Sequence, residues 1–473
     1  MKQIAAVFRN QGKVFLRDRG MIVFYLLAAM VIGIAVPFFG KGIVYSLSFA
    51  ALMTATFLTP LLADGMAGER EKKTLESLLS TAIKGSRIVW GKFLFSMLFA
   101  TVFFSLCAAL AVAAHTVLGM ETGFSGFLWI CAGLLALMNF AATVLGGLYQ
   151  SALSGDTRIA YSRVSLIAFP MGILYMVALT ALTVVGTEES PLVLIIFLAI
   201  YGVIAALFAV MTLRLRQHTY FQKVRLSKKR VTQRLRMDEP RSRSQVSTVF
   251  AHEMRYVAKL KMLMLMFALL CAAPAAMCVS CYAYFGSLNL DLAVLVTALM
   301  VPRTTTNLIA YSIGGEKTYK TAESLLSTPL KVGSVFMAKM LVPVVLSAVM
   351  LVISSVLTMV GVNIVGEYFE GGVRYLYTAD QLVQLFPASL LACVFMVLIT
   401  GVLSARMKKP RNGLYVSSVL GFLFIIPPLC IIYLASNQLL WSLIYCAVML
   451  TANVVSLIAI ARNISRPQLM GWI

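Results

Sequence analysis

Long apolar runs, separated by shorter polar segments, divide the chain regularly. Six runs lie in the first half, at 21–39, 43–63, 93–118, 127–149, 164–185 and 192–213, and six in the second, at 262–285, 290–313, 340–362, 382–404, 414–434 and 439–461. Each is close to the ~20 residues that an α-helix needs to cross a bilayer. The pattern therefore predicts an all-α membrane protein with twelve transmembrane helices.

One charged segment occurs twice. Residues 68–92, GEREKKTLESLLSTAIKGSRIVWGK, return 247 residues later as residues 315–339, GEKTYKTAESLLSTPLKVGSVFMAK. Each copy lies between the second and third apolar run of its half, and its apolar positions fall at helical spacing. We expect two short amphipathic helices outside the bilayer, with a charged face that suits a partner protein. A solvated loop would explain the charges but not the repetition.

The repeat implies two related halves. Each half opens with a basic amphipathic stretch, residues 1–19 and 244–261, that is predicted to lie along the membrane interface. Residues 214–243 carry eleven Lys or Arg and only two acids. We therefore expect a first half at 1–213, a basic cytoplasmic linker at 214–243 and a second half at 244–473. A lipid-sensing role for the linker is the alternative, because basic segments bind anionic leaflets.

The formal charge of +22 is distributed as a topology signal. With twelve helices, the segments rich in Lys and Arg all fall on one side of the membrane, which the positive-inside rule assigns to the cytoplasm together with both termini. Six helices separate the two copies of the charged segment, so both copies face the cytoplasm. The halves are then parallel repeats about an axis normal to the membrane.

The sequence carries no recognisable catalytic motif. No GK pair has the upstream glycine of a phosphate-binding loop, so ATP hydrolysis by that route is excluded. His252 and Glu253 open an HExx pattern, but Tyr256 stands where a zinc protease has its second histidine. The eight cysteines lie within apolar runs, which favours packing over disulfides or metal binding. We expect no metal, no cofactor and no enzymatic activity in this chain.

The segments GERE, TLESLL and ST of the repeated stretch resemble the coupling-helix motif of ABC-2 type permeases, the membrane subunits of ABC exporters of the sodium-efflux, antibiotic and peptide-export kind. The resemblance covers the chain twice, as if two permease units were fused. It implies a bacterial cell-membrane protein that moves substrate out by alternating access. It also implies separate ABC ATP-binding subunits, in two copies, that hold ATP and Mg and dock on the coupling helices.

Carried onto this sequence, the resemblance assigns ATPase coupling to ten residues. They are Glu69, Arg70, Leu75, Glu76, Leu78, Leu79, Glu316, Glu323, Leu325 and Leu326. Copy two departs from copy one at Lys317, Thr318, Tyr319 and Ala322, so the two ATPases are not expected to dock equally.

Three polar residues inside apolar runs are candidates for a substrate pathway. Arg303 is placed deep in its run, where an arginine costs about 2.5–3.5 kcal/mol, and Asn139 and Asn453 are the other two. Asn139 and Asn453 are most simply explained by interhelical hydrogen bonds, with pathway lining as the alternative. For Arg303 the alternative to a pathway role is packing, or a span boundary that lets its side chain reach the interface. An ion-coupled secondary transporter with twelve helices is the alternative function. It normally needs acidic residues within the membrane, and the apolar runs hold essentially none.

Overall fold

The architecture comes from a computed structural model of the chain. It describes residues 2–17, 19–35, 37, 43–71, 85–119, 125–155, 157–184, 186–214, 245–259, 261–285, 290–291, 293–298, 308–309, 312–313, 332–369, 374–406, 424 and 426–463. Within these ranges the regular structure is helical. The chain divides into two compact units, Met1–Glu239 and Pro240–Ile473, and the division falls in the basic segment between the halves.

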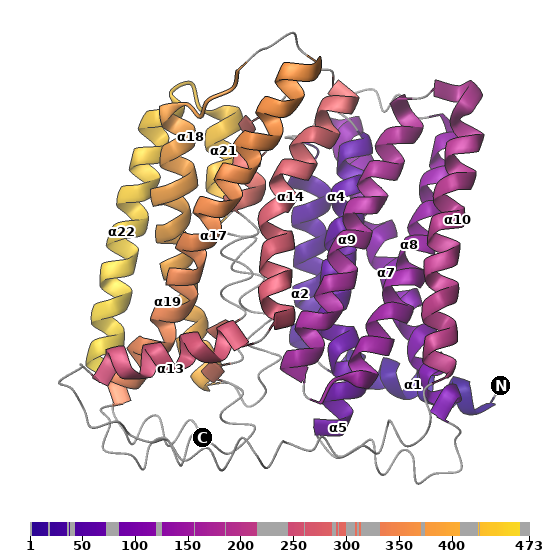
Figure 1. Cartoon of the computed structure of the whole chain (residues 1–473), viewed down its shortest axis with the longest axis horizontal. Helices are drawn as coiled ribbons and strands as arrows, with labels where there is room; N and C mark the ends of the chain where they lie inside the picture. Colours follow the sequence, from indigo (N-terminus) through magenta and orange to yellow (C-terminus); the bar gives the residue numbers. More distant parts are fainter. Residues whose placement is uncertain are drawn as a thin grey trace. The chain divides into compact units, whose positions relative to one another are not determined.

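The first unit begins with α1 (Lys2–Arg17), which lies across the long helices (Figure 1). The chain then runs through α2 (Arg19–Met30), η1 (Val31–Ala35), α4 (Ile43–Ala63), η2 (Asp64–Gly68), α5 (Glu69–Glu71), α7 (Gly85–Val117), α8 (Gly126–Leu153), α9 (Thr157–Val184) and α10 (Gly186–Leu213). The apolar face of α1 packs on α7, and its other face exposes basic residues such as Arg9 and Lys13. This is the arrangement expected of an amphipathic entry helix.

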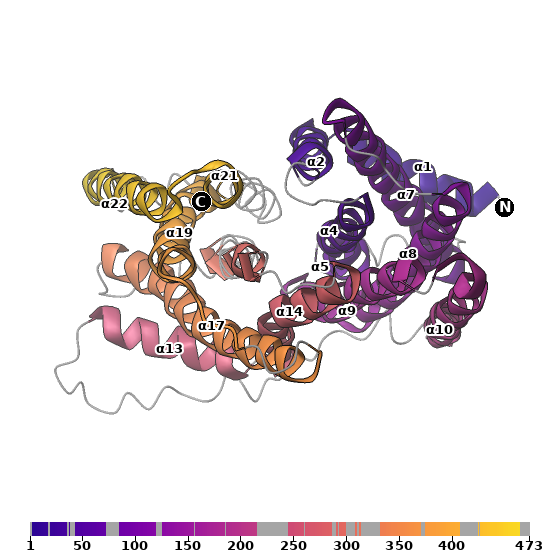
Figure 2. The ribbon, with the colours of Figure 1, turned by 90° about the horizontal axis from the view of Figure 1, so that it is seen from above.

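Helix α4 forms the interior of the first unit. Views along the helices show it with α7, α8 and α9 beside it (Figure 2). Gly172 of α9 lets the two backbones approach, since a Cβ there would lie 3.0 Å from the Cα of Leu52. Helix α10 lies at the edge of the unit and exposes leucines and isoleucines, which suits a lipid-facing helix.

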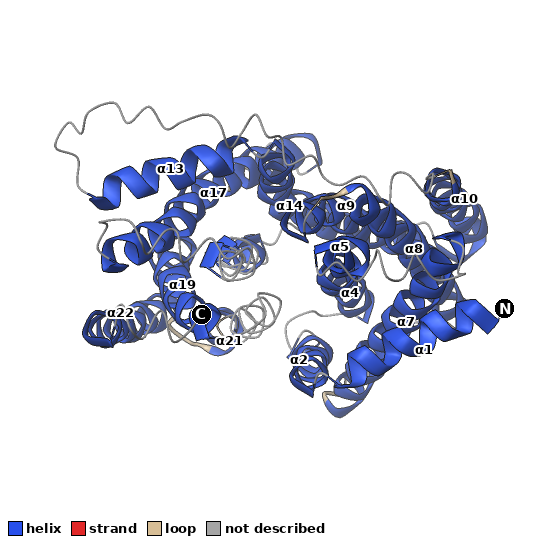
Figure 3. Cartoon of the chain, turned by 90° about the horizontal axis from the view of Figure 1, so that it is seen from below, coloured by secondary structure: helices blue, strands red, loops and turns tan. Residues whose placement is uncertain are grey.

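The second unit also begins with an amphipathic helix that precedes a long apolar one. It contains α13 (Gln245–Lys259), α14 (Lys261–Phe285), α17 (Val332–Phe369), α18 (Ala379–Val383), η3 (Gln384–Ala388), α19 (Ser389–Arg406), α21 (Ile426–Leu434) and α22 (Gln438–Asn463). Helix α13 packs on α17 as α1 packs on α7 (Figure 3). It meets α14 at 81°, so it lies along the interface where α14 enters the membrane.

The described part of the chain holds 8 helices that are long and apolar enough to cross a membrane, or 9 if the bent pair α13 and α14 counts as one span. Tyr25–Ile34 is a shorter apolar helix. The protein is thus an all-helical, multi-pass membrane protein. Large parts of the apolar runs 290–313 and 414–434 lie outside the described residues, so the count of twelve and the parallel repeat stay predictions.

At the far end of α17 the chain forms an extended strap, residues 374–378. Tyr375 and Tyr377 face inward and pack on the cluster of Cys278, Leu290, Ala293 and Val362. The Tyr377 hydroxyl donates to the Ser355 carbonyl at 3.2 Å. The amide of Asn363 holds the strap in both directions, because it donates to the Tyr375 carbonyl at 3.1 Å and accepts from the Tyr375 N–H at 2.8 Å.

Candidate functional site

The repeated segment begins where the second span of the first half ends. There α4 widens into the π-helical turn η2, and α5 follows with Glu69, Arg70 and Glu71. Single π-turns inside helices are frequent at functional sites, because the extra residue displaces backbone groups from their usual partners. Residues 72–84, the rest of the predicted coupling helix, lie outside the described residues.

Ser151 of α8 holds the widened turn. Its hydroxyl accepts hydrogen bonds from the N–H groups of Met66 and Ala67, both at 3.1 Å, and donates to the Ala63 carbonyl at 3.0 Å. A serine hydroxyl has one proton and two lone pairs, so these three bonds use its full capacity. The side chain therefore ties the widened turn to α8 through three buried hydrogen bonds.

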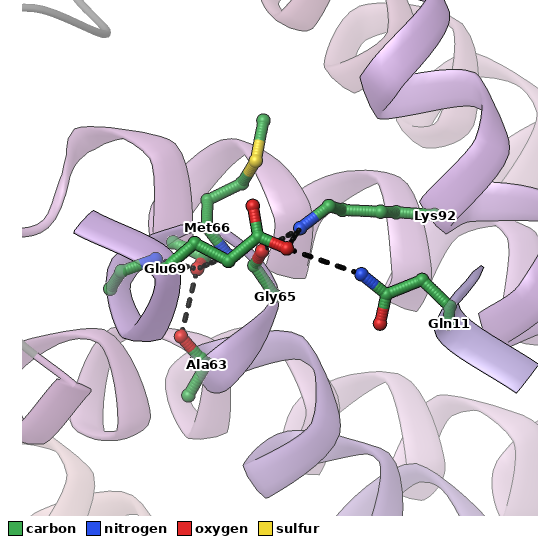
Figure 4. A network of polar contacts seen from close by, with 8 residues as sticks. Gln11, Ala63, Gly65, Met66, Glu69 and Lys92 are labelled. Atoms are coloured by element: carbon green, nitrogen blue, oxygen red, sulfur yellow. Dashed lines mark hydrogen bonds and ion pairs between the residues drawn. The ribbon is translucent and has the colours of Figure 1, made fainter. Parts of the chain in front are cut away.

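Lys92 of α7 lies against the start of the repeated segment, together with Gln11 of α1 (Figure 4). We call the meeting point of Gln11, Gly65, Glu69 and Lys92 the first junction. The Lys92 side chain is only 3% exposed, and its Nζ lies 2.5 Å from Glu69 Oε1. Nζ also donates to the carbonyl of Gly65, and Gln11 Nε2 of α1 donates to the same Glu69 oxygen at 3.2 Å. A buried ammonium is stable only when it is paired and hydrogen-bonded. The ion pair therefore ties the entry helix, the second span and the third span together.

Arg70 makes the other anchor of the repeated segment. Its guanidinium donates to the carbonyl of Ser154 and, at 2.7 Å, to that of Ala152, at the C-terminal end of α8. The last carbonyls of a helix lack intrahelical partners and carry partial negative charge, so a cation there is stabilising. Glu69 and Arg70 are thus bound within the chain, although the Glu69 side chain stays 21% exposed. Their ATPase contact remains a prediction.

The second half contains a corresponding junction around Lys339, which is 4% exposed. Its Nζ lies 2.8 Å from Glu253 Oε1 of α13 and donates to Ser312 Oγ at 3.0 Å. Lys339 follows Lys92 by 247 residues, and Ser312 follows Gly65 by the same interval. The repeat therefore places a buried lysine against the same partner position in both halves.

The sequence alone could have indicated that these two lysines matter, although neither was among the predicted coupling residues. Lys92 and Lys339 end the two copies of the repeat and stand directly before long apolar stretches. A charge retained at the edge of a span in both halves indicates a partner there. The sequence did not show which groups surround each lysine: Glu69 of the same repeat pairs with Lys92, whereas Glu253, which pairs with Lys339, is far away along the chain.

The remaining predicted coupling residues lie outside the described residues. They are Leu75, Glu76, Leu78, Leu79, Glu316, Glu323, Leu325 and Leu326. Arg303, the first pathway candidate, lies outside them as well.

The other two pathway candidates are buried. Asn453 of α22 donates to the Leu391 carbonyl of α19 at 2.9 Å, which is an interhelical hydrogen bond. Asn139 of α8 is fully buried, and within the described residues neither its amide nitrogen nor its oxygen has a hydrogen-bond partner. A substrate pathway along these residues remains a prediction. The described ranges also contain no cluster of three His, Cys, Asp or Glu that could hold a metal.

The comparisons with known proteins concern the second half. Residues 250–427 match the model of a family described as ABC-2 family transporter protein. The matched span contains Glu253, Ser312 and Lys339, so it includes the second junction. A comparison with curated proteins finds no match. The family match, on a multi-pass helical protein, supports an ABC-2 type permease, the membrane component of an ABC transporter.

Proposed function

We propose that the chain is the complete membrane unit of an ATP-driven ABC exporter, two fused permease halves that move substrate out of the cytoplasm by alternating access. Two copies of a separate ATPase subunit bind the repeated segments at the cytoplasmic face. ATP and Mg belong to that partner. Both termini are in the cytoplasm, and the membrane is the bacterial cell membrane.

The observation that carries this proposal is the anchoring of the first repeated segment. Glu69 and Arg70 fix its start to α7 and α8, while the ion pair with Lys92 also involves α1 through Gln11. A partner that pushes on a segment fixed in this way moves several spans together. The family match on residues 250–427 gives independent support.

The test is copurification. A tagged full-length chain, extracted from its own cells in mild detergent, should bring down an ATP-binding subunit that mass spectrometry identifies. The double variant Glu76→Arg with Glu323→Arg should lose this subunit, because it reverses charge on both expected docking faces. Glu367→Arg is the matched control. Glu367 is exposed near the C-terminal end of α17, far along the helix from Lys339, so this variant should keep the subunit.

Two results would contradict the proposal. One is the absence of any ATP-binding protein from the purified chain. The other is retention of the subunit by the double variant in normal amounts. The ion-coupled alternative predicts transport that continues after ATP is depleted and stops when the ion gradient is collapsed.

A further inference from the structure

The two junctions differ in the residue that the entry helix contributes. Val7 and Phe8 of α1 correspond to Val249 and Phe250 of α13, which lie 242 residues later. By this alignment Gln11 corresponds to Glu253. Both helices pack on the third span of their half, α7 or α17, so the equivalence holds in the fold as well as in the sequence.

This one position changes the charge pattern around the buried lysine. In the first half Gln11 is neutral, and its amide reaches Lys92 only through Glu69, which belongs to the repeated segment. In the second half Glu253 carries a carboxylate and contacts Lys339 directly at 2.8 Å. The entry helix therefore donates a hydrogen bond to the ion pair in the first half and supplies its carboxylate in the second.

We propose that Lys92 and Lys339 are positioning residues that fix the start of the third span. The residue at the position of Gln11 and Glu253 then decides whether the entry helix contributes a carboxylate to the ion pair. A buried ammonium needs a carboxylate in contact, but the carboxylate can come from either of two elements that meet there. The first half takes it from the repeated segment. The second half takes one from the entry helix.

The two arrangements have different mechanical consequences, which is where this inference rests on the proposed function. In the first half a displacement of the repeated segment pulls on α7 through an ion pair. In the second half α13 and α17 are held to each other by an ion pair and move as one body. The entry helix would then follow the third span more tightly in the second half than in the first.

The test moves the carboxylate within the first half. Glu69→Gln removes the carboxylate that lies against Lys92 and should lower the melting temperature of the purified full-length chain in detergent by about 5 °C or more. Adding Gln11→Glu supplies a carboxylate from the entry helix, as in the second half, and should restore most of the loss. Gln and Glu have nearly the same volume, so this rescue requires charge.

Asn10→Glu in the Glu69→Gln background is the matched control. Asn10 is the neighbouring residue of α1 and is exposed, so a carboxylate there should not restore stability. If Glu69→Gln does not accumulate, the variant Lys92→Met with Glu69→Gln should fold, because it removes both charges of the pair together.

The outcomes separate cleanly. Rescue by Gln11→Glu but not by Asn10→Glu supports the proposal. Equal stability of the Glu69→Gln chain with and without Gln11→Glu overturns it, and so does equal rescue by Asn10→Glu. The proposal is also overturned if Lys92→Met with Glu69→Gln is no better folded than Glu69→Gln alone. None of these measurements involves an ATPase, so failure here is distinct from failure of the proposed function.

Discussion

Single side chains at the first junction satisfy several backbone groups at once, and Ser151 is the clearest case. Ser151→Ala would remove three hydrogen bonds to backbone groups of the widened turn in a buried place. We expect a loss of about 1–3 kcal/mol in stability, the usual cost of unsatisfied buried groups. Thermal unfolding of the purified chain measures it.

Ser154→Ala is the control for this prediction. Ser154 is also buried, but its hydroxyl donates only within its own helix turn, to the Gln150 carbonyl at 2.7 Å. Its loss should therefore cost less than that of Ser151. Equal costs for the two serines would mean that the π-turn does not depend on the Ser151 hydroxyl.

Tyr377 of the strap predicts a pH dependence. Burial raises the pKa of its phenol to about 12 from the ordinary value of 10.0. A raised pKa means that the folded chain favours the neutral phenol. This stabilisation is complete below pH 10 and is lost as the pH rises through about 12.

The measurement is an alkaline absorbance titration of tyrosinate in the wild type and in Tyr377→Phe. The difference between the two curves should be a single phenol that ionises near pH 12 rather than near pH 10. Tyr368→Phe, a change at a residue 79% exposed, should leave that late step in place. If Tyr377→Phe instead loses a phenol that ionises near pH 10, the strap does not bury Tyr377.

At the scale of elements, the close approach of α1 to α7 depends on Gly91. A Cβ at this position would lie 2.7 Å from the Val7 Cβ and 3.1 Å from the Ile4 carbonyl oxygen. Gly91→Ala must therefore displace the entry helix, at a cost of about 1–3 kcal/mol from overpacking. It should also increase cleavage within α1 by added protease.

Gly12→Ala gives the comparison, since a Cβ there meets nothing closer than Phe95 at 3.9 Å. Both changes bring the same gain in helix propensity, about 1 kcal/mol, so the difference between them isolates the contact with Val7. If the two variants unfold at the same temperature, α1 is not held against α7 as described.

The sequence predicted the positions of the described helices well, because apolar runs in a membrane protein have few alternatives to helix. The run 43–63 coincides with α4, and the runs 192–213 and 439–461 lie within α10 and α22. The third spans were predicted too short. Helices α7 and α17 begin about eight residues before the apolar run, at Gly85 and Val332, in the end of the repeated segment, and they pack on α1 and α13.

The junctions could be predicted only in part. The repeat drew attention to Glu69, Arg70 and the coupling motif, but the outward-facing role expected for Glu69 and Arg70 did not anticipate their bonds to Lys92 and α8. Such bonds depend on which spans meet, and hydropathy does not contain that information. Ser151 gave no signal either, because a serine just after the apolar run 127–149 is ordinary.

For the whole molecule, the central prediction is topological, and the length of α17 makes it independent of the total number of spans. This helix has 38 residues, ~57 Å at 1.5 Å per residue, which exceeds a ~30 Å hydrocarbon core. Lys339 and Tyr368 are 29 residues apart on it, ~44 Å. They must therefore lie on opposite sides of the membrane.

If the junctions face the cytoplasm, a reporter that is active only in the cytoplasm should be silent when fused after Tyr368. The same reporter should be active after Arg406, because α18, η3 and α19 together return the chain across the membrane. A reporter that is active only outside should give the opposite pair. Activity in the cytoplasm at Tyr368 would place the junction of Lys339 outside the cell, beyond the reach of any cytoplasmic ATPase, and would contradict the proposed coupling as well as the orientation.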